Sequence, residues 1–385
     1  MLAEAAFSTE YPSVDFLRRK AHKRVPGFAM DYLEGGCHSE INLRRNTAKI
    51  RELRLRPYYL RDYSGSDLST ELFGHTYGAP FGVAPIGLQG LMWPRATEIL
   101  ARAAHENNIL FCLSTVATAS IEKVAELTEG RFWFQLYHPA EQDVRDKILD
   151  RAAAAGCRTL VILADTPTFG YRPKEIRNGL SIPPRMTLRN VLQMTTRPRW
   201  AFSQLFAGAP EFKTLKPYIP KGRGMKHLGQ FMNKTFDGRL SEDRVRSLRE
   251  KWKGKLVIKG IVTEEDAEKA IRLGADGIIV SNHGGRQLDA GQAAVESLAG
   301  LAKKYGDRLT VMMDSGIRTG ADVAAAMASG AQFTFLGRTF MYGVAALGER
   351  GGGHTIYMLQ RQLQQVMEQI ACEHPRDFPK HLIEG

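Results

Sequence analysis

Several features typical of membrane-spanning, secreted or metal-binding proteins are missing from this sequence of 385 residues. No apolar run reaches the roughly 18 residues that a membrane-spanning helix needs. Residues 1–20 include Glu4, Glu10 and Asp15 and lack a continuous apolar core, which argues against a secretory signal. We therefore expect a reduced, cytoplasmic chain without a metal site. The four cysteines form neither a CxxC pair nor a metal-ligand spacing: Cys37, Cys112, Cys157 and Cys372.

Acidic residues are also scarce, because 53 Lys and Arg face 41 Asp and Glu and leave a formal net charge of +12. A basic balance favours an acidic partner, such as nucleic acid, an anionic membrane surface or an anionic substrate, although surplus cations can also simply solvate a surface. The asymmetry is concentrated in residues 185–235, here called the basic segment, where ten Lys and Arg oppose Glu211 alone. Six aromatic residues are interleaved with them: Trp200, Phe202, Phe206, Phe212, Tyr218 and Phe231.

Short apolar runs of strand-forming residues recur along the rest of the chain, and helical patterns follow most of them. The predicted strands are 80–84, 110–113, 132–137, 159–163, 255–259, 277–280, 309–313 and 333–336. The predicted helices are 96–107, 121–127, 141–155, 264–273, 293–304 and 320–328, with a last helical stretch after the eighth strand. Eight apolar strands alternating with helices predict a single α/β (β/α)₈ barrel of TIM type. An open doubly wound sheet is the alternative.

Two regions fall outside this repeat. We expect residues 1–75 to form an N-terminal extension that packs on the barrel, which itself spans residues 76–372. A long insertion, roughly residues 166–254, separates the fourth and fifth strands and contains the basic segment.

Polar residues gather where the predicted strands end, which is the rim that carries the active site in barrels of this kind. So many polar groups from separate strands predict an active site rather than isolated structural residues. They are Gln135, Tyr137, Asp165, Lys259, Ser281, Asn282, His283, Arg286, Asp314, Arg318, Gly337 and Arg338.

The loops after the seventh and eighth strands predict a phosphate site. They read Asp314-Ser315-Gly316-Ile317-Arg318 and Leu336-Gly337-Arg338, and barrels commonly bind phosphate there with backbone N–H groups and a helix N-terminus. No GxGxxG follows an early strand. A single phosphate site favours FMN over FAD or a nicotinamide.

The run from Ser281 to Asp289, SNHGGRQLD, resembles the signature of the FMN-dependent L-2-hydroxy acid oxidases and dehydrogenases, the family of glycolate oxidase, L-lactate dehydrogenase and mandelate dehydrogenase. The resemblance spans nearly the whole chain. It implies the barrel fold, FMN, and oxidation of an L-2-hydroxy acid to a 2-keto acid with flavin N5 as hydride acceptor. It also covers Asp31-Tyr32, Phe134 to Tyr137, Asp165 to Pro167, Val257 to Gly260 and Asp314 to Arg338.

The resemblance also implies roles for individual residues. His283 is expected to be the general base, supported by Asp165, while Tyr137 contacts the substrate oxygen and Lys259 lies near flavin N1 and the C2 oxygen. The substrate carboxylate is expected on Arg172, Arg286 and Tyr32. The isoalloxazine and ribityl chain are expected to contact Pro85, Ile86, Gly87, Ser114, Gln135 and Ser281. The ribityl chain and phosphate are expected on Asp314, Ser315, Gly316, Ile317, Arg318, Gly337 and Arg338.

Four positions depart from the family pattern, and the chain looks more like mandelate dehydrogenase at one of them, Gly87, and in the run Leu91-Met92-Trp93-Pro94. Leu163 replaces the usual Thr, so one hydrogen bond to the flavin should be missing. Gly87, Val116 and Leu33 replace larger side chains. They predict room for a branched or aromatic hydroxy acid such as mandelate, with lactate as the main rival, unless neighbouring residues refill the space.

Several alternatives remain open at this point. The electron acceptor is a quinone, a cytochrome or, in an oxidase, oxygen, and the hydride and carbanion mechanisms use the same residues. A non-oxidative FMN barrel enzyme of the isomerase type would not need His283 and the two arginines. Basic charge alone suggests nucleic acid, but no recognised reading module supports it. The resemblance implies a homo-oligomer, a tetramer. The basic segment is either a contact to the cytoplasmic face of the inner membrane or an active-site lid. In the first case Trp200, Phe202, Phe206 and Phe231 could enter the headgroup region, and in the second the aromatic residues pack on the barrel.

Overall fold

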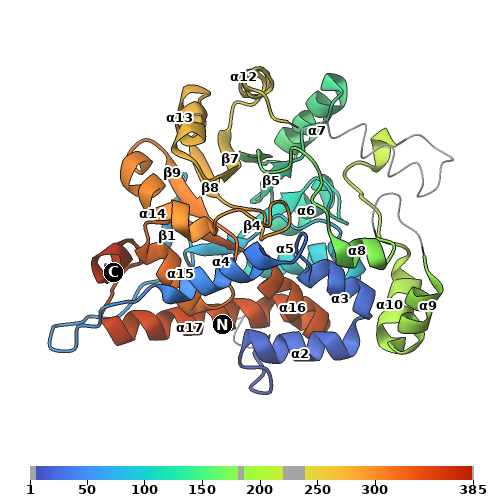
Figure 1. Cartoon of the computed structure of the whole chain (residues 1–385), viewed down its shortest axis with the longest axis horizontal. Helices are drawn as coiled ribbons and strands as arrows, with labels where there is room; N and C mark the ends of the chain where they lie inside the picture. Colours follow the sequence, from blue (N-terminus) through green and yellow to red (C-terminus); the bar gives the residue numbers. More distant parts are fainter. Residues whose placement is uncertain (1–5, 181–185, 220–238, 384–385) are drawn as a thin grey trace.

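Eight parallel strands close into a barrel in the computed structural model of the chain, which describes residues 6–180, 186–219 and 239–383 (Figure 1). The strands follow one another around the barrel in chain order, and the last pairs with the first. The predicted (β/α)₈ barrel is therefore confirmed, and the open sheet is excluded. The strands are β3 Phe81–Val83, β4 Leu110–Ser114, β5 Trp133–Leu136, β6 Thr159–Leu163, β7 Lys255–Ile261, β8 Gly277–Val280, β9 Thr310–Met313 and β10 Phe333–Leu336.

The strands are predominantly apolar because both faces of the sheet are covered. On β6, for example, Leu160 and Ile162 belong to the cluster under the helices, whereas Val161 belongs to the cluster inside the barrel. Side chains of a strand alternate between its two faces, so a strand buried on both sides has no polar face.

Helices cover the outside of the barrel close to their predicted positions. Several begin where a hydroxyl accepts a bond from a backbone N–H in the first turn, as Ser120, Thr263 and Thr319 do. The helices are α5 Ala96–Glu106, α6 Ile121–Thr128, α7 Gln142–Ala154, α12 Glu242–Lys251, α13 Glu264–Arg272, α14 Ala294–Tyr305, α15 Gly320–Ala328, α16 Arg338–Leu347 and α17 Gly351–Ile370. Short 3-10 turns complete the set at Gln89–Leu91, Gly348–Arg350 and Pro375–His381.

Elements that precede β3 pack on the barrel from two sides. Helix α2 (Val14–Arg24) lies against α16, and α4 (Ile41–Glu52) lies against α14 and α15. Between them, α3 (Gly27–Glu34) contacts a short helix of the insertion. An antiparallel hairpin, β1 Thr70–Leu72 and β2 His75–Tyr77, adds Phe73 and Tyr77 to the aromatic cluster inside the barrel.

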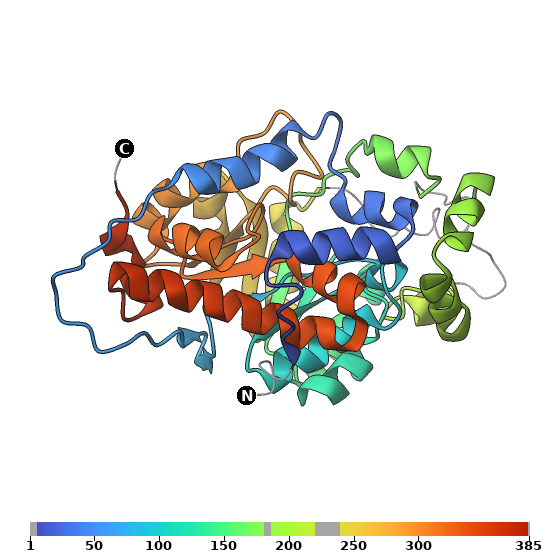
Figure 2. The same ribbon diagram turned by 90° about the horizontal axis from the view of Figure 1, so that it is seen from below.

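The insertion between β6 and β7 forms short helices: α8 Pro173–Arg177, α9 Leu188–Thr195, α10 Pro198–Ala207 and η2 Lys216–Tyr218. Figures 1 and 2 both place α9 and α10 at one end of the molecule, far from the extended segment 53–69 at the other end. In the part of the chain that the structure describes, no helix combines the length and apolar character required to cross a bilayer.

One detail of the basic segment differs from the sequence-based expectation. We expected Trp200 to be among the aromatic residues available to a membrane, but its side chain is 4% exposed and its Nε1 donates to the carbonyl oxygens of Leu91 and Met92. Its ring also meets Phe28 edge-on. Trp200 therefore anchors α10 to the barrel, because an amphipathic ring with a satisfied N–H is stable inside. Phe231 and part of the basic segment lie outside the described residues.

Candidate active site

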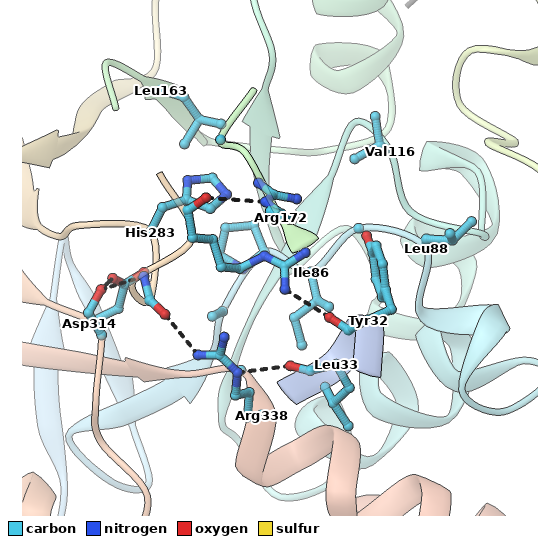
Figure 3. Close-up of a pocket in the computed structure, with 18 of the residues that line it drawn as sticks. Tyr32, Leu33, Ile86, Leu88, Val116, Leu163, Arg172, His283, Asp314 and Arg338 are labelled. Atoms are coloured by element: carbon cyan, nitrogen blue, oxygen red, sulfur yellow. Dashed lines mark hydrogen bonds between the residues drawn. The ribbon is translucent and has the colours of Figure 1, made fainter. Parts of the chain in front are cut away.

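A cavity of about 580 Å³ opens at the carboxyl ends of the barrel strands (Figure 3). Most of the predicted site residues line it, from Tyr32 on α3 to Arg338 at the start of α16. Three predicted residues lie directly behind the wall, each bonded to one that lines it: Asp165 to His283, Ser114 to Gln135 and Ser281 to Lys259. The rim therefore brings together residues that are spread over most of the sequence.

His283 is held in a fixed orientation beside a buried carboxylate. Its Nδ1 lies 2.9 Å from Asp165 Oδ1, which assigns the Nδ1 proton to that bond and leaves Nε2 without it. The backbone of His283 has a φ of 58°, a strained value for a side chain of this size, and its N–H donates to Ser281 Oγ. Burial lowers the pKa of His283, while the charge of Asp165 partly opposes this.

Lys259 links the two carboxylates of the rim. Its Nζ lies 3.0 Å from Asp314 Oδ2 and 3.6 Å from Asp165 Oδ2, and it donates to Ser281 Oγ at 2.7 Å. Burial disfavours the charged forms of Asp165 and Lys259, yet His283 and Lys259 lower the pKa of Asp165 to about 2. Asp314 and Asp165 in turn raise the pKa of Lys259 despite its burial. Lys259 thus stays cationic in the site.

Gly260 permits this close approach of neighbouring strand ends. It has a φ of 100°, and a Cβ there would lie 2.5 Å from the Cβ of Asp165. The strand register shifts between Lys259 and Ile261 at the same point. A bulge at this position therefore brings Lys259 and Asp165 together.

Two arginines face the cavity and share one acid. Arg286 donates to the carbonyl oxygens of Tyr32 and Gly35 and, at 2.6 Å, to Glu175 Oε1. Arg172 donates to the carbonyl oxygen of Arg286, as a dashed line in Figure 3 marks, and its Nη1 lies 3.5 Å from both carboxylate oxygens of Glu175. Burial and the neighbouring Arg286 lower the pKa of Arg172.

Two further arginines make the other end of the cavity positive. Arg338 donates to the carbonyl oxygens of Leu33, Gly284 and Gly35, and burial together with Arg318 lowers its pKa to about 9. Among the described residues, no carboxylate forms an ion pair with either guanidinium. Such buried and unneutralised charge fits a bound phosphate.

The backbone around these arginines is also suited to an anion. Ser315 and Gly316 both have positive φ, and Gly337 precedes the first turn of α16. A Cβ on Gly316 would lie 2.7 Å from the carbonyl carbon of Asn46, so a larger residue would displace α4. Backbone N–H groups of such loops and of helix N-termini bind phosphate.

The remaining wall suits a planar ring with polar edges. Gln135 Nε2 is buried and has no hydrogen-bond partner among the described residues, while Ser114 fixes the orientation of the amide by donating to Oε1. Pro85, Ile86 and Gly87 form an apolar wall of the cavity. An unpaired buried amide is costly, so it fits a ligand that accepts a hydrogen bond. The donor set therefore fits FMN, whose ring would be held by Gln135 and Lys259 and whose phosphate would be held by Arg318 and Arg338.

Several residues that shape the site were not found from the sequence. Glu175 stands three residues after Arg172 in a short helix, where an acid is ordinarily a favourable first-turn residue and gives no separate signal. Asn46 of α4 exchanges two amide hydrogen bonds with Asn282, at 2.8 and 2.7 Å. Asn282 Oδ1 also accepts from the N–H of Gly285. The N-terminal extension thus supports the His283 loop.

Comparison with known proteins assigns the family. Residues 21–384 match the family model described as FMN-dependent dehydrogenase. The chain is 39% identical to an L-lactate dehydrogenase of Xanthomonas euvesicatoria pv. vesicatoria over 91% of its own length and 90% of the relative. It is 38% identical to an L-lactate dehydrogenase of Alcaligenes faecalis, over 92% and 93% of the two chains. A crystal structure of the monotopic membrane protein (S)-mandelate dehydrogenase superimposes with a TM-score of 0.92 at 33% identity, over 98% of this chain and all of the other. The chain therefore belongs to the family of FMN-dependent dehydrogenases.

Proposed function

We propose that this enzyme oxidises L-2-hydroxy acids to 2-keto acids, with His283 as the general base. The observation that carries the proposal is the partly buried His283–Asp165 pair beside the two arginines, Arg172 and Arg286, at the cavity. A base next to a carboxylate-binding pair suits a substrate that bears a hydroxyl beside a carboxylate. The relatives named above act on lactate and mandelate, which are such acids.

Each residue near the base has a physical part in this reaction. Nε2 of His283 takes the substrate proton, and Asp165 stabilises the imidazolium that results. Burial, followed by the charge of Asp165, raises the pKa of Tyr137 to about 12, so its hydroxyl stays a hydrogen-bond donor to the substrate oxygen. Bound FMN supplies the two-electron acceptor, and the cationic Lys259 stabilises negative charge beside it.

The walls of the cavity favour a hydroxy acid with a sizeable apolar side chain. Gly87, Val116 and Leu33 line it, together with Met92 and Phe212. Figure 3 shows Leu88, Val116 and Tyr32 along one side. We therefore propose mandelate-like acids as preferred substrates and lactate as the main rival. Comparing kcat/KM for L-mandelate, L-lactate and glycolate tests this, and a strong preference for glycolate contradicts it.

Anaerobic reduction of the purified holoenzyme tests the reaction itself. L-lactate or L-mandelate should bleach the flavin absorbance, and the D-enantiomers should not. An isomerase-type barrel or a protein that only binds flavin would keep its colour with both enantiomers. Readmission of air then separates an oxidase, which recolours at once, from a dehydrogenase, which recolours with a quinone or cytochrome.

We further propose that the exposed side of α9 and α10 binds the surface of an anionic membrane. Phe202, Leu205 and Phe206 are 61%, 75% and 87% exposed, and Leu188 and Leu192 of α9 are also exposed. Exposed cations flank this apolar surface, and its neighbour Trp200 fixes it to the barrel. In interfacial binding, apolar side chains usually enter the headgroup region while neighbouring cations contact anionic lipid. A lipid-soluble quinone would then be the natural electron acceptor.

Vesicle binding separates this proposal from a simple lid. The full chain should bind vesicles containing anionic lipid at low salt, and binding should weaken as salt rises. The triple variant Phe202→Ser, Leu205→Ser, Phe206→Ser should bind at least tenfold more weakly with unchanged flavin reduction, on the order of 1 kcal/mol or more for each exposed apolar side chain that leaves the interface. If the wild-type protein does not bind these vesicles at low salt, the membrane proposal is wrong and the segment is an active-site lid.

We also propose that the enzyme is a homo-oligomer, with four subunits by family resemblance. The extended segment 53–69 carries Leu60 fully exposed beside the exposed Tyr59, which suits burial against another subunit. Light scattering of the wild type and of Leu60→Ser tests this proposal. A wild-type monomer at micromolar concentration contradicts it.

A further inference from the structure

We propose that Glu175 sets the charge of the substrate-carboxylate site and thereby selects singly charged 2-hydroxy acids over doubly charged ones. This inference rests on the proposed oxidation of 2-hydroxy acids at the His283 site. It concerns a side chain that lines the same cavity, although it takes no proton from the substrate.

Glu175 is buried between the two guanidinium groups. Its Oε1 lies 2.6 Å from Arg286 Nη2 and 3.5 Å from Arg172 Nη1, and Oε2 lies 3.5 Å from the same atom of Arg172. Arg286 is further held by the carbonyl oxygens of Tyr32 and Gly35, and its guanidinium lies 5.1 Å from the centroid of the Tyr32 ring. The acid and its two partners therefore form one fixed group of three charges.

The position of Glu175 is itself fixed from outside the cavity. On the same helix, Lys174 forms an ion pair with Glu40 at 2.9 Å. At the end of that helix, Asn178 donates to Asp31 Oδ2 at 2.7 Å. These bonds tie α8 to the N-terminal extension, so the backbone that carries Glu175 is held in place beside the arginines.

The charges of the cavity divide into separate groups. Asp165 and Asp314 pair with His283 and Lys259, and Glu175 is the described acid that contacts Arg172 and Arg286. Two guanidinium groups and one carboxylate leave a net charge of +1. One substrate carboxylate neutralises this site.

A second carboxylate on the substrate would find no free positive charge at this site. Burying an unpaired charge is unfavourable, so a hydroxy diacid should bind poorly although it carries the same 2-hydroxy acid end. Replacing Glu175 by a neutral residue raises the net charge of the site to +2 and removes the repulsion between the Glu175 carboxylate and a second substrate carboxylate. Selectivity among substrates then follows from a repulsive element built into the site.

The test compares L-lactate with L-malate, which are singly and doubly charged at neutral pH. Glu175→Gln keeps the shape and the oxygen that faces Arg286 but removes the charge. The ratio of kcat/KM for malate to that for lactate should rise by about tenfold, as expected for one added charge at close range. The same direction should appear without turnover, as tighter binding of malonate relative to acetate in a flavin absorbance titration.

Two controls separate charge from packing. Glu175→Asp keeps the charge, so the malate-to-lactate ratio should stay within about threefold of the wild type. Glu40→Gln removes an acid that supports the same helix without facing the arginines, and its ratio should also stay unchanged. Flavin content, measured by absorbance, identifies variants that fail to fold.

The outcomes distinguish this inference from the function on which it rests. A wild type that is not reduced by any 2-hydroxy acid overturns the proposed function. The role of Glu175 alone is overturned if lactate reduces the flavin of the wild type but Glu175→Gln, loaded with flavin, behaves like the wild type. In that case the malate-to-lactate ratio of kcat/KM and the binding of malonate relative to acetate are both unchanged. The role of Glu175 is also overturned if the malate-to-lactate ratio of kcat/KM rises equally in the Glu40→Gln control.

Discussion

The barrel rim and the insertion after β6 differ in how their side chains are held. On the rim, His283, Lys259 and Asp165 are connected by bonds between buried or partly buried groups, and the strands below them are predominantly apolar. In the insertion, Trp200 is buried while Phe206, six residues later on the same helix, is 87% exposed. A residue that is buried on all sides has few possible side-chain positions. In a surface helix, by contrast, the burial of each residue depends on which neighbouring elements the helix contacts.

This difference assigns separate tasks to the two regions. In the proposed reaction the rim carries the chemistry, because proton transfer requires groups held within hydrogen-bond distance. The insertion contributes Arg172 and Glu175 close to the barrel and an apolar surface farther out. Its effects should therefore fall on substrate choice, stability and location rather than on the chemical step. The predictions below test that division.

The largest effect is expected from His283→Gln on the rim. The variant should keep its flavin, because Arg318 and Arg338, which we propose hold the phosphate, are unchanged, but it should lose the proposed base. We expect the rate of flavin reduction by substrate to fall by about 10²–10⁴-fold. Anaerobic stopped-flow measures the rate, and Phe206→Ser in the insertion is the matched control with a near-native rate. A histidine variant that reduces normally would refute the division.

The same difference explains what could be predicted from the sequence. The predicted ends of all eight strands lie within about two residues of the observed ends. Short apolar runs between helical patterns are typical of strands that are buried on both faces. The rim residues followed from the strand ends and from the family signature. The sequence left open whether the aromatic residues of α10 contact a membrane or pack on the barrel. Trp200 packs on the barrel, and the sequence could not single it out because the aromatic residues look alike until the loop around Leu91 is in place.

Glu175 and the Asn46–Asn282 pair were missed for a related reason. Each depends on a contact between residues that are more than 100 positions apart. No local pattern reports such a contact, because an acid early in a helix or an asparagine within one is ordinary. Geometry alone distinguished them.

The next largest effect concerns the stability of the insertion. Trp200→Ala removes a buried ring and leaves the carbonyl oxygens of Leu91 and Met92 without a donor, which should cost about 3–5 kcal/mol of unfolding free energy. Phe206→Ala, on the same helix but exposed, should change it by less than about 0.5 kcal/mol. Urea denaturation with FMN in excess measures both. Equal effects would mean that α10 does not pack on the barrel as described.

A third prediction concerns pH and belongs to the rim. The proposed base His283 can accept a proton only when it is neutral, and burial lowers its pKa below the ordinary value. The value of kcat/KM should therefore be constant at neutral pH and fall about tenfold per pH unit once the pH drops below that pKa. Asp165→Asn removes the charge that opposes the lowering, so the fall should begin at lower pH and the plateau should also be lower. A fall that begins at higher pH in the variant would contradict this.

The smallest expected effect compares the two regions as walls for the substrate side chain. A Cβ at Gly87, on the barrel, would lie 2.8 Å from Val116 Cγ2, so Gly87→Ala must push Val116 outward. We expect kcat/KM for L-mandelate to fall by about two- to fivefold relative to L-lactate, because a shift of one methyl-sized group is worth about 1 kcal/mol or less. Val116→Ala should restore the ratio in the double variant. Phe212→Ala, on the insertion, should instead widen the cavity and raise the ratio. If only the Phe212 variant changes it, the insertion rather than the barrel determines the preferred side chain.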